Sequence, residues 1–113
     1  MVSEKEKTIL LNIIKHCSRV EEKMAGVTKD VFLANRDIID IVCFNIFQIG
    51  ELAKNLSKEF LLEYDGMPWK SIKGMRDRVG HGYGTIDFEQ VWTTASQDIK
   101  PLREYCEEIV KNN

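Results

Sequence analysis

Apolar residues recur at alternating steps of three and four along most of the chain, a spacing that predicts amphipathic helices. The first predicted helix begins at Ser3, where Ser3 and Glu6 have the spacing of a capping box, and it ends before Gly26. Its apolar stripe consists of Leu10, Ile13, Cys17, Val20 and Met24. No segment alternates with the period of two that strands require, so the pattern predicts an all-α protein.

The second predicted helix is apolar on more than one side. It begins near Thr28 or Asn35 and ends near Leu56. One stripe consists of Ile38, Val42, Ile49, Leu52 and Leu56, and the apolar residues that point elsewhere are Ile41, Phe44, Ile46 and Phe47. Such a helix must be covered on more than one side. The second cover is either another copy of the chain, which we favour, or the remaining helices of a small bundle.

Three further helices are predicted. A short one covers residues 57–64, and the next runs from Pro68 to Val79, with proline at the first position, where its missing N–H costs nothing. The buried side of that helix is expected to hold Trp69, Ile72, Met75 and Val79. The last helix begins at Asp87, which forms a second capping pair with Gln90 and starts an apolar stripe that continues to the end of the chain.

Glycine and proline residues are expected to interrupt the helical pattern at two places. Three glycines between residues 80 and 84 predict a loop, since each glycine costs about 1 kcal/mol in a helix relative to alanine. Pro101 is expected to kink or split the last helix, because proline removes a helical hydrogen bond and its ring clashes with the preceding turn. The elements together predict a single domain over residues 1–113, an antiparallel up-and-down bundle of four to five helices.

Composition narrows the classes of protein that fit. The 113 residues carry a net charge of −2, whereas proteins that coat nucleic-acid duplexes are usually basic overall, so contact with nucleic acid would need a local basic patch. The three cysteines, Cys17, Cys43 and Cys106, lack a CxxC spacing and are interpreted as reduced thiols in a cytosolic core. The N-terminus lacks the apolar segment of a signal peptide, and no apolar run approaches the ~20 residues of a membrane span. We therefore expect a cytoplasmic protein without a membrane partner.

The two histidines differ in their surroundings. His16 lies beside Cys17 on a helix, where sequence neighbours face different ways, so we interpret it as a surface or boundary residue and predict no metal site. His81 follows the most basic segment of the chain, in which four cations oppose Asp77. These cations are Lys70, Lys73, Arg76 and Arg78. A local positive patch in an acidic protein is where an anionic substrate is expected to bind.

Helix geometry brings Arg76 and His81 into one candidate site. At ~100° per residue, Arg76 falls at the border between the apolar stripe and the basic side of its helix, a position suited to a site at a subunit interface. Gly80 lets the helix end before His81, so that the two side chains can converge. These residues indicate a phosphate-handling site. The alternative interpretation is a solvated basic helix followed by a flexible loop.

The segment from Arg76 to Tyr83 reads Arg, four residues, His, one residue, Tyr. This pattern resembles the signature of the HepT-like toxins within the HEPN superfamily. Further segments that resemble the family are Ile49-Gly50-Glu51 with Ala53, Pro68 to Met75, and Asp87 to Trp92. Many relatives carry asparagine directly after the arginine, where this chain has Asp77. The resemblance covers most of the chain from residue 38 onward.

The resemblance implies a HEPN-like fold and a metal-independent endoribonuclease toxin of a type II (HEPN/MNT) toxin–antitoxin system. Arg76 and His81 would be catalytic at a composite site in a homodimer, with Asp77 auxiliary. The chain itself would need no cofactor. The antitoxin would be an MntA-like minimal nucleotidyltransferase, which takes ATP and transfers AMP to Tyr83, blocking the path of the RNA.

Other residues receive supporting roles in this hypothesis. Lys70, Lys73 and Arg78 are candidates to bind flanking RNA phosphates. Gly50 indicates a close approach of helices, and Glu51 fits structural support better than a role in the site. Two alternatives to a nuclease stay open: a non-enzymatic partner or nucleotide- or substrate-binding module of a minimal nucleotidyltransferase, and an inert helical dimer.

Overall fold

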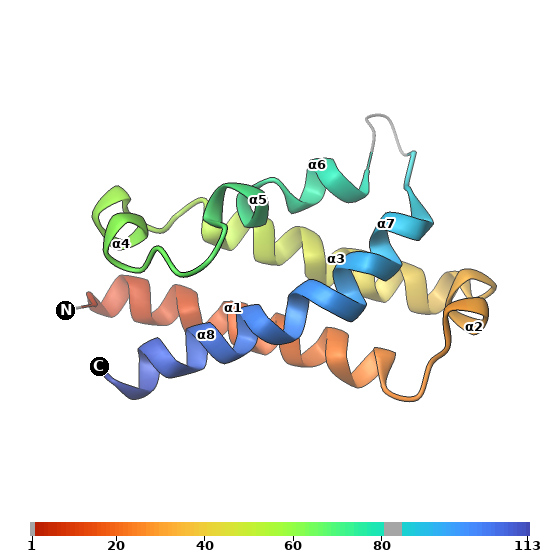
Figure 1. The fold of residues 1–113 in the computed structure, drawn as a ribbon, viewed down its shortest axis with the longest axis horizontal. Helices are drawn as coiled ribbons and strands as arrows, with labels where there is room; N and C mark the ends of the chain where they lie inside the picture. Colours follow the sequence, from red (N-terminus) through yellow and green to blue (C-terminus); the bar gives the residue numbers. More distant parts are fainter. Residues whose placement is uncertain (1, 81–84) are drawn as a thin grey trace.

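Helices make up nearly all the regular structure of this protein, which a computed structural model describes for residues 2–80 and 85–113. The elements are α1 (Glu4–Met24), α2 (Lys29–Leu33), α3 (Arg36–Ala53), α4 (Lys58–Glu63), α5 (Trp69–Lys73), α6 (Met75–Val79), α7 (Phe88–Thr93), the π-helical segment η1 (Thr94–Asp98) and α8 (Ile99–Lys111). The chain reverses direction from α1 to α3, again to α5 with α6, and again to α7 with α8 (Figure 1). The predicted all-α, up-and-down architecture is confirmed.

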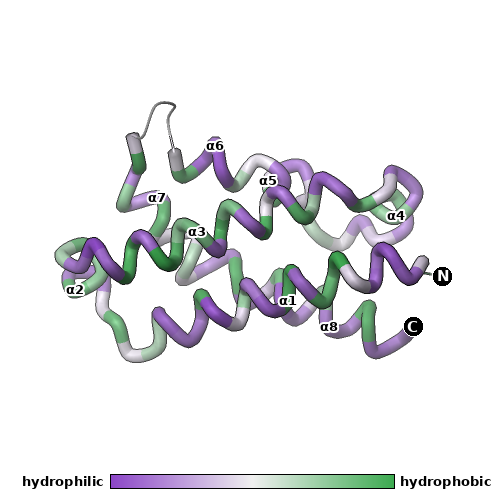
Figure 2. The backbone as a smooth tube through the Cα atoms, turned by 180° about the vertical axis from the view of Figure 1, so that it is seen from behind, coloured by the Kyte–Doolittle hydropathy of each residue, from purple (hydrophilic) through white to green (hydrophobic). Residues whose placement is uncertain are grey.

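Helix α1 is packed between α3 and α8. Its predicted stripe is buried from Leu10 to Val20, whereas Met24 at the end of the helix is only partly covered. Green apolar and purple polar positions alternate along the helices in Figure 2, as the sequence pattern predicts. The buried residues of all the long helices form one core cluster, so the helices stabilise one another by removing these stripes from water.

The two start points predicted for the second helix are both used. The side chain of Thr28 accepts a hydrogen bond from the N–H of Val31 and caps α2, and the side chain of Asn35 accepts from Ile38 and caps α3. The predicted single helix is therefore two helices, and the longer one ends at Ala53 rather than near residue 56.

The apolar residues of α3 divide between the core and the surface. Ile46, which was predicted to point away from the main stripe, is fully buried, so the bundle itself covers that side. Ile41 and Phe44 keep 39% and 54% of their surface exposed. The apolar surface of α3 that remains exposed is therefore smaller than the sequence indicates, and it includes Ile41 and Phe44.

The predicted helix from Pro68 to Val79 is divided at Gly74. There the backbone adopts φ −93° and ψ 10°, which ends α5 at Lys73 and starts α6 at Met75. Pro68 precedes the first helical residue instead of occupying it. The expected buried side, made up of Trp69, Ile72, Met75 and Val79, is confirmed.

The last helix is split, as Pro101 predicts, but the irregular segment lies before the proline. Residues Thr94–Asp98 form the wider π-helical turn η1, and the α-helical pattern resumes at Ile99. Since the ring of Pro101 would crowd the carbonyl group four residues earlier in an unbroken α-helix, widening this turn accommodates it. The predicted cap at Asp87 is confirmed by a 3.0 Å hydrogen bond from the N–H of Gln90.

Glu6 links two helix starts that lie far apart in the sequence. Ser3 accepts a hydrogen bond from the N–H of Glu6, as predicted, but the Glu6 carboxylate mainly serves the start of α4. It accepts hydrogen bonds from the N–H of Ser57, at 3.1 Å, and from the Ser57 hydroxyl. The two chain ends meet at this same end of the bundle, where the N–H of Val2 donates to the Oδ1 of Asn113 at 3.2 Å (Figure 1).

Candidate active site

Gly50 brings α3 close to the junction between α5 and α6. A Cβ atom at this position would lie 3.5 Å from the carbonyl oxygen of Ile72, 3.6 Å from that of Lys73 and 3.8 Å from the backbone nitrogen of Arg76. Gly50 is itself buried. The close approach expected from the sequence is therefore present, and it fixes the backbone of Arg76 against the long helix.

The side chain of Arg76 points outward from α6 and faces Glu51. Its Nη1 lies 3.9 Å from the Oε1 of Glu51, and 66% of the arginine side chain is exposed. The same carboxylate oxygen lies 3.2 Å from the Nζ of Lys54. Glu51 thus stands between two cations and neutralises neither completely, which leaves the guanidinium of Arg76 accessible to an anion.

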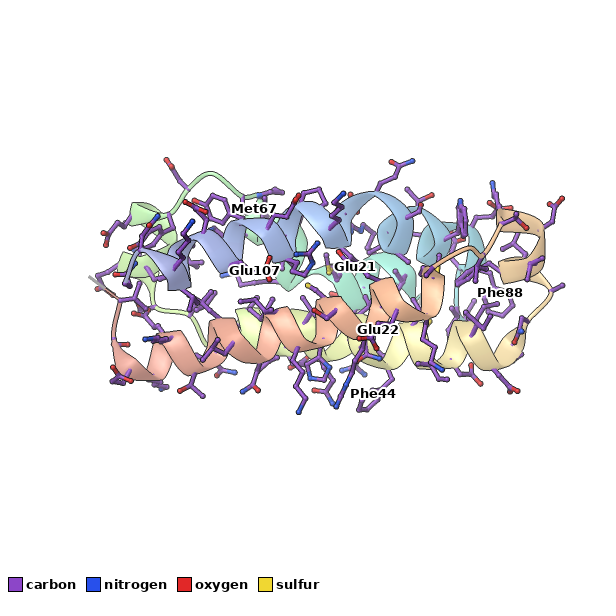
Figure 3. The ribbon with its side chains drawn as sticks, turned by 90° about the horizontal axis from the view of Figure 1, so that it is seen from below. Glu21, Glu22, Phe44, Met67, Phe88 and Glu107 are labelled. Atoms are coloured by element: carbon purple, nitrogen blue, oxygen red, sulfur yellow. The ribbon has the colours of Figure 1, made fainter. Side chains whose placement is uncertain are left out.

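A shallow cavity of about 270 Å³ adjoins this ion pair. Its lining residues come from two elements, α3 and α6: Phe44, Phe47, Gln48, Glu51 and Arg76. Figure 3 shows Phe44 projecting away from the bundle. The exposed ring of Phe44 and the candidate catalytic Arg76 therefore line the same cavity, a combination that the sequence pattern did not indicate.

Backbone hydrogen bonds join the residues that precede residues 81–84 to those that follow them. Helix α6 ends at Val79, and Gly80 adopts an extended conformation, as predicted for a helix stop. Gly80 pairs in antiparallel fashion with Ile86, and the N–H of Asp87 donates to the carbonyl oxygen of Val79 at 2.9 Å. The other predicted site residues of this segment, His81 and Tyr83, lie outside the residues that the structure describes, and so does most of the predicted loop.

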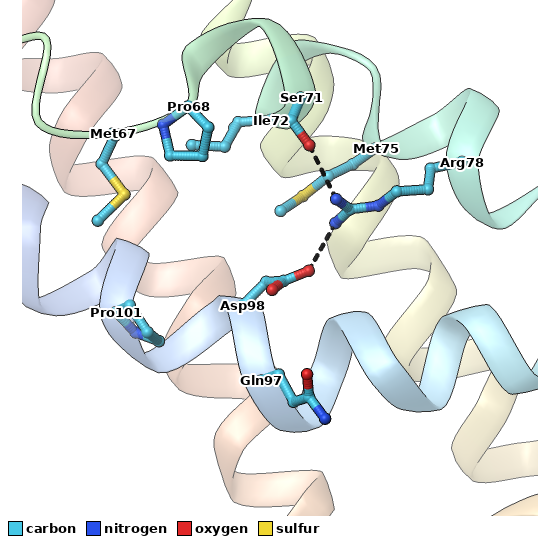
Figure 4. A pocket seen from close by; sticks show the side chains of 9 residues that line it. All are labelled: Met67, Pro68, Ser71, Ile72, Met75, Arg78, Gln97, Asp98 and Pro101. Carbon is cyan, nitrogen blue, oxygen red and sulfur yellow. Dashed lines mark hydrogen bonds and ion pairs between the residues drawn. The ribbon is translucent and has the colours of Figure 1, made fainter.

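Arg78 turns toward the last helix and away from the exposed side of α6 (Figure 4). Its Nη1 donates to the Oγ of Ser71 at 2.8 Å, and its Nη2 donates to the Oδ2 of Asp98 at 2.8 Å and to the Oγ1 of Thr94 at 3.2 Å. Only 29% of the arginine side chain is exposed. This geometry favours a structural role over the predicted contact with RNA.

The interpretation of Arg78 as part of a solvated basic face is therefore corrected. Its partner Asp98 lies twenty residues further along the chain, and no local pattern pointed to it. The arginine and the aspartate border a small, largely apolar cavity of about 170 Å³. The residues that complete its lining are Met67, Pro68, Ser71, Ile72, Met75, Gln97 and Pro101 (Figure 4).

The other polar residues of this region remain at the surface. Lys70 is exposed and Lys73 is half-buried, and neither forms an ion pair within residues 2–80 and 85–113. Asp77 is exposed and has no bond to Arg76 in the same part of the chain. The carboxylate that faces Arg76 is thus Glu51, not its sequence neighbour.

His16 and the three cysteines lie where the sequence pattern predicts them. His16 is half-buried at the boundary, and its Nδ1 lies 2.7 Å from the Oδ1 of Asn45. Among the residues that the structure describes, no three metal-binding side chains cluster, and no helix is long and apolar enough to cross a membrane.

All three cysteines are free and buried. Burial, with a smaller contribution from Asp40, raises the pKa of Cys43 to about 11. This thiol is therefore not an activated nucleophile.

Comparison with known proteins gives a consistent result. The family described as "Ribonuclease HepT-like" matches residues 13–109. A "Putative RNase" of Caldanaerobacter subterraneus subsp. tengcongensis is 30% identical over 90% of this chain and 91% of its own length. A "Probable ribonuclease HepT" of Thermococcus cleftensis is 28% identical over 93% of this chain and 96% of its own.

A third relative is a longer protein. The "Gamma-glutamylcyclotransferase and putative RNase" of Methanocaldococcus jannaschii is 34% identical over 94% of this chain, which spans only 50% of the length of that protein. No solved structure matches the chain.

Proposed function

Because the chain belongs to the Ribonuclease HepT-like family, we propose that it is a metal-independent endoribonuclease toxin with Arg76 and His81 as its catalytic pair. The observation that carries the proposal is the side chain of Arg76, which is 66% exposed and whose backbone nitrogen lies at the close packing around Gly50. In the sequence His81 lies two residues after the end of that helix, with Gly80 between them.

The proposed chemistry uses the RNA's own 2′-hydroxyl as the nucleophile. An imidazole removes the 2′ proton, the 2′-oxygen bonds to the adjacent phosphorus, and the bond from phosphorus to the 5′-oxygen breaks. A second, protonated imidazole gives its proton to the leaving 5′-oxygen, so the products are a 2′,3′-cyclic phosphate and a 5′-hydroxyl. Arg76 stabilises the extra negative charge of the pentavalent transition state, and Lys70 and Lys73 bind flanking phosphates.

The need for two imidazoles is the reason to propose a homodimer with a composite site. Each chain supplies one histidine, His81, in the motif. The exposed Phe44 lines the same cavity as Arg76, so a second copy packed against this aromatic ring lies beside the arginine. Phe44→Asp is expected to convert the dimer to a monomer in light scattering and to abolish cleavage; a variant that stays dimeric would refute this choice of interface.

The regulatory part of the proposal concerns Tyr83. An MntA-like minimal nucleotidyltransferase antitoxin transfers AMP from ATP to the hydroxyl group of this tyrosine with release of pyrophosphate, and the bulky anionic group repels RNA phosphates. Incubation of the toxin with the antitoxin and ATP should add the mass of AMP to wild type and not to Tyr83→Phe. The location of the pair in the cytoplasm stays a prediction.

The nuclease activity is tested by expressing the chain without its partner. Wild type should arrest growth and fragment RNA, whereas His81→Ala and Arg76→Ala should do neither. Lys111→Ala is the control, because it removes an exposed cation from the C-terminal end of α8, a helix that packs mainly against α1. If wild type is folded but leaves growth and RNA intact, the chain is instead a non-enzymatic partner or binding module of the nucleotidyltransferase. If, in addition, it binds neither the nucleotidyltransferase nor a nucleotide, it is an inert helical dimer.

A further inference from the structure

Resting on the proposed function, we propose that Glu51 is a positioning residue that orients the guanidinium of Arg76 toward the substrate phosphate. The pair joins the Oε1 of Glu51 and the Nη1 of Arg76 at 3.9 Å. Within residues 2–80 and 85–113, Glu51 is the acidic residue that pairs with Arg76. Asp77, which sequence position favours for this task, makes no such contact in that part of the chain.

Glu51 and Arg76 belong to helices of very different length. Glu51 belongs to the eighteen-residue helix α3, directly after the buried Gly50 at the contact with the α5–α6 junction. Arg76 belongs to the five-residue helix α6, which follows the break at Gly74. A long packed helix thus supplies a fixed carboxylate against which the arginine of a short helix is aligned.

Lys54 adjusts how strongly Glu51 holds the arginine. Its Nζ lies 3.2 Å from the same Oε1 that faces Arg76. Because this carboxylate is shared between two cations, it orients Arg76 without saturating its charge. The guanidinium therefore keeps donors available for a phosphate, which binds more strongly than a shared carboxylate at 3.9 Å.

The exposure of the pair predicts a distinctive kinetic signature. The side chains of Arg76 and Glu51 are 66% and 49% exposed, and ion pairs in such positions contribute little to folding stability. Loss of Glu51 therefore leaves the fold intact, misorients Arg76 in the transition state and removes a negative charge that repels RNA. The expected result is a lower kcat with a KM that is unchanged or lower.

The kinetic test compares Glu51→Gln with Glu107→Gln. Glu107 is a matched control, since its side chain is 48% exposed and it also pairs with an arginine, Arg103, far from the site on α8. Glu51→Gln should lower kcat by about tenfold without raising KM, Glu51→Asp should recover part of the loss, and Glu107→Gln should match wild type. An unchanged kcat, or a drop in melting temperature with kcat and KM both impaired, would overturn the proposal.

A spectroscopic test reads the contact without any cleavage. In ¹⁵N-arginine-labelled protein free of RNA, Glu51→Gln should shift the side-chain resonance of Arg76, assigned by its loss in Arg76→Ala. Glu107→Gln should shift that of Arg103 instead. An Arg76 resonance that is identical in wild type and Glu51→Gln would refute the proposal. If wild type cuts no RNA, the proposed nuclease function fails, and this spectrum still decides whether Glu51 holds Arg76.

Discussion

Replacing Arg78 with alanine tests whether this residue ties helices together or binds RNA. The substitution removes one hydrogen bond to a carboxylate, worth about 1.5–3 kcal/mol in a buried setting, and two to hydroxyl groups, worth about 0.5–1.5 kcal/mol each. Asp98 and Arg78 are 39% and 29% exposed, so solvent screening lowers the first figure. We expect a loss of about 2 kcal/mol in the free energy of unfolding.

The expected loss translates into a readily measured shift. With an unfolding entropy of about 2.1 cal/mol/K per residue, a chain of 113 residues should melt ~8 °C lower. Thermal unfolding followed by circular dichroism measures this shift. Arg78→Lys should fall between wild type and Arg78→Ala, because one ammonium group cannot reach all three acceptors. Lys70→Ala, at an exposed position, should melt like wild type.

Binding of a non-cleavable RNA over a range of salt concentrations supplies the second measurement. Lys70→Ala should weaken binding and reduce the salt slope by about one, as expected for a lost phosphate contact. Arg78→Ala should leave the slope unchanged. If Arg78→Ala melts within about 1 °C of wild type and lowers the slope instead, the structural role assigned to Arg78 is wrong.

Three further predictions follow from the packing and the pKa shifts. Gly50→Ala should melt close to wild type, because the added Cβ would lie at an ordinary contact distance of 3.5 Å from the nearest backbone atom. Gly50→Leu should displace the α5–α6 junction, lower the melting temperature and reduce RNA cleavage. Equal melting temperatures of the two variants would contradict this packing argument. Burial alone would raise the pKa of Glu6, but hydrogen bonds from Ser57 and Ser3 lower this pKa overall. The stability that the Glu6 carboxylate contributes is therefore present above the unfolded carboxyl pKa of about 4.3, and it is lost as the pH falls through the lower pKa of the folded state. Melting curves of wild type and Glu6→Gln should therefore converge in acid, and a difference that grows there would refute the assignment. Burial raises the pKa of all three cysteines, so a thiol reagent at mildly alkaline pH should label the folded protein slowly and all three residues after denaturation.

The sequence predicts those parts of the fold that depend on local chemistry. The cap of α1, most of its stripe and the cap at Asp87 were readable from residue type and spacing, and Thr28 and Asn35 were expected as alternative starts of one helix. The division at Gly74 was not, because one glycine costs only about 1 kcal/mol in a helix and tertiary packing decides whether the helix breaks there.

The candidate site was predictable only in part, for a similar reason. The position of Arg76 at the edge of the apolar stripe follows from helical geometry. Its pairing with Glu51, and that of Arg78 with Asp98, join residues twenty or more positions apart and depend on which helices pack together. Charged residues on a short helix look solvated in a sequence, and only the fold shows that Arg76 is largely exposed whereas Arg78 is partly buried and hydrogen-bonded to three side chains.

The contact between Val2 and Asn113 gives the protein a modular character. Both ends of the chain lie beside each other at one end of the bundle, whereas α6 and α7 lie nearer the opposite end, where α2 packs against α7 (Figure 1). A second domain appended to either end would therefore stand clear of the Arg76 surface, and joining the two ends through a short linker should give circular permutants that fold.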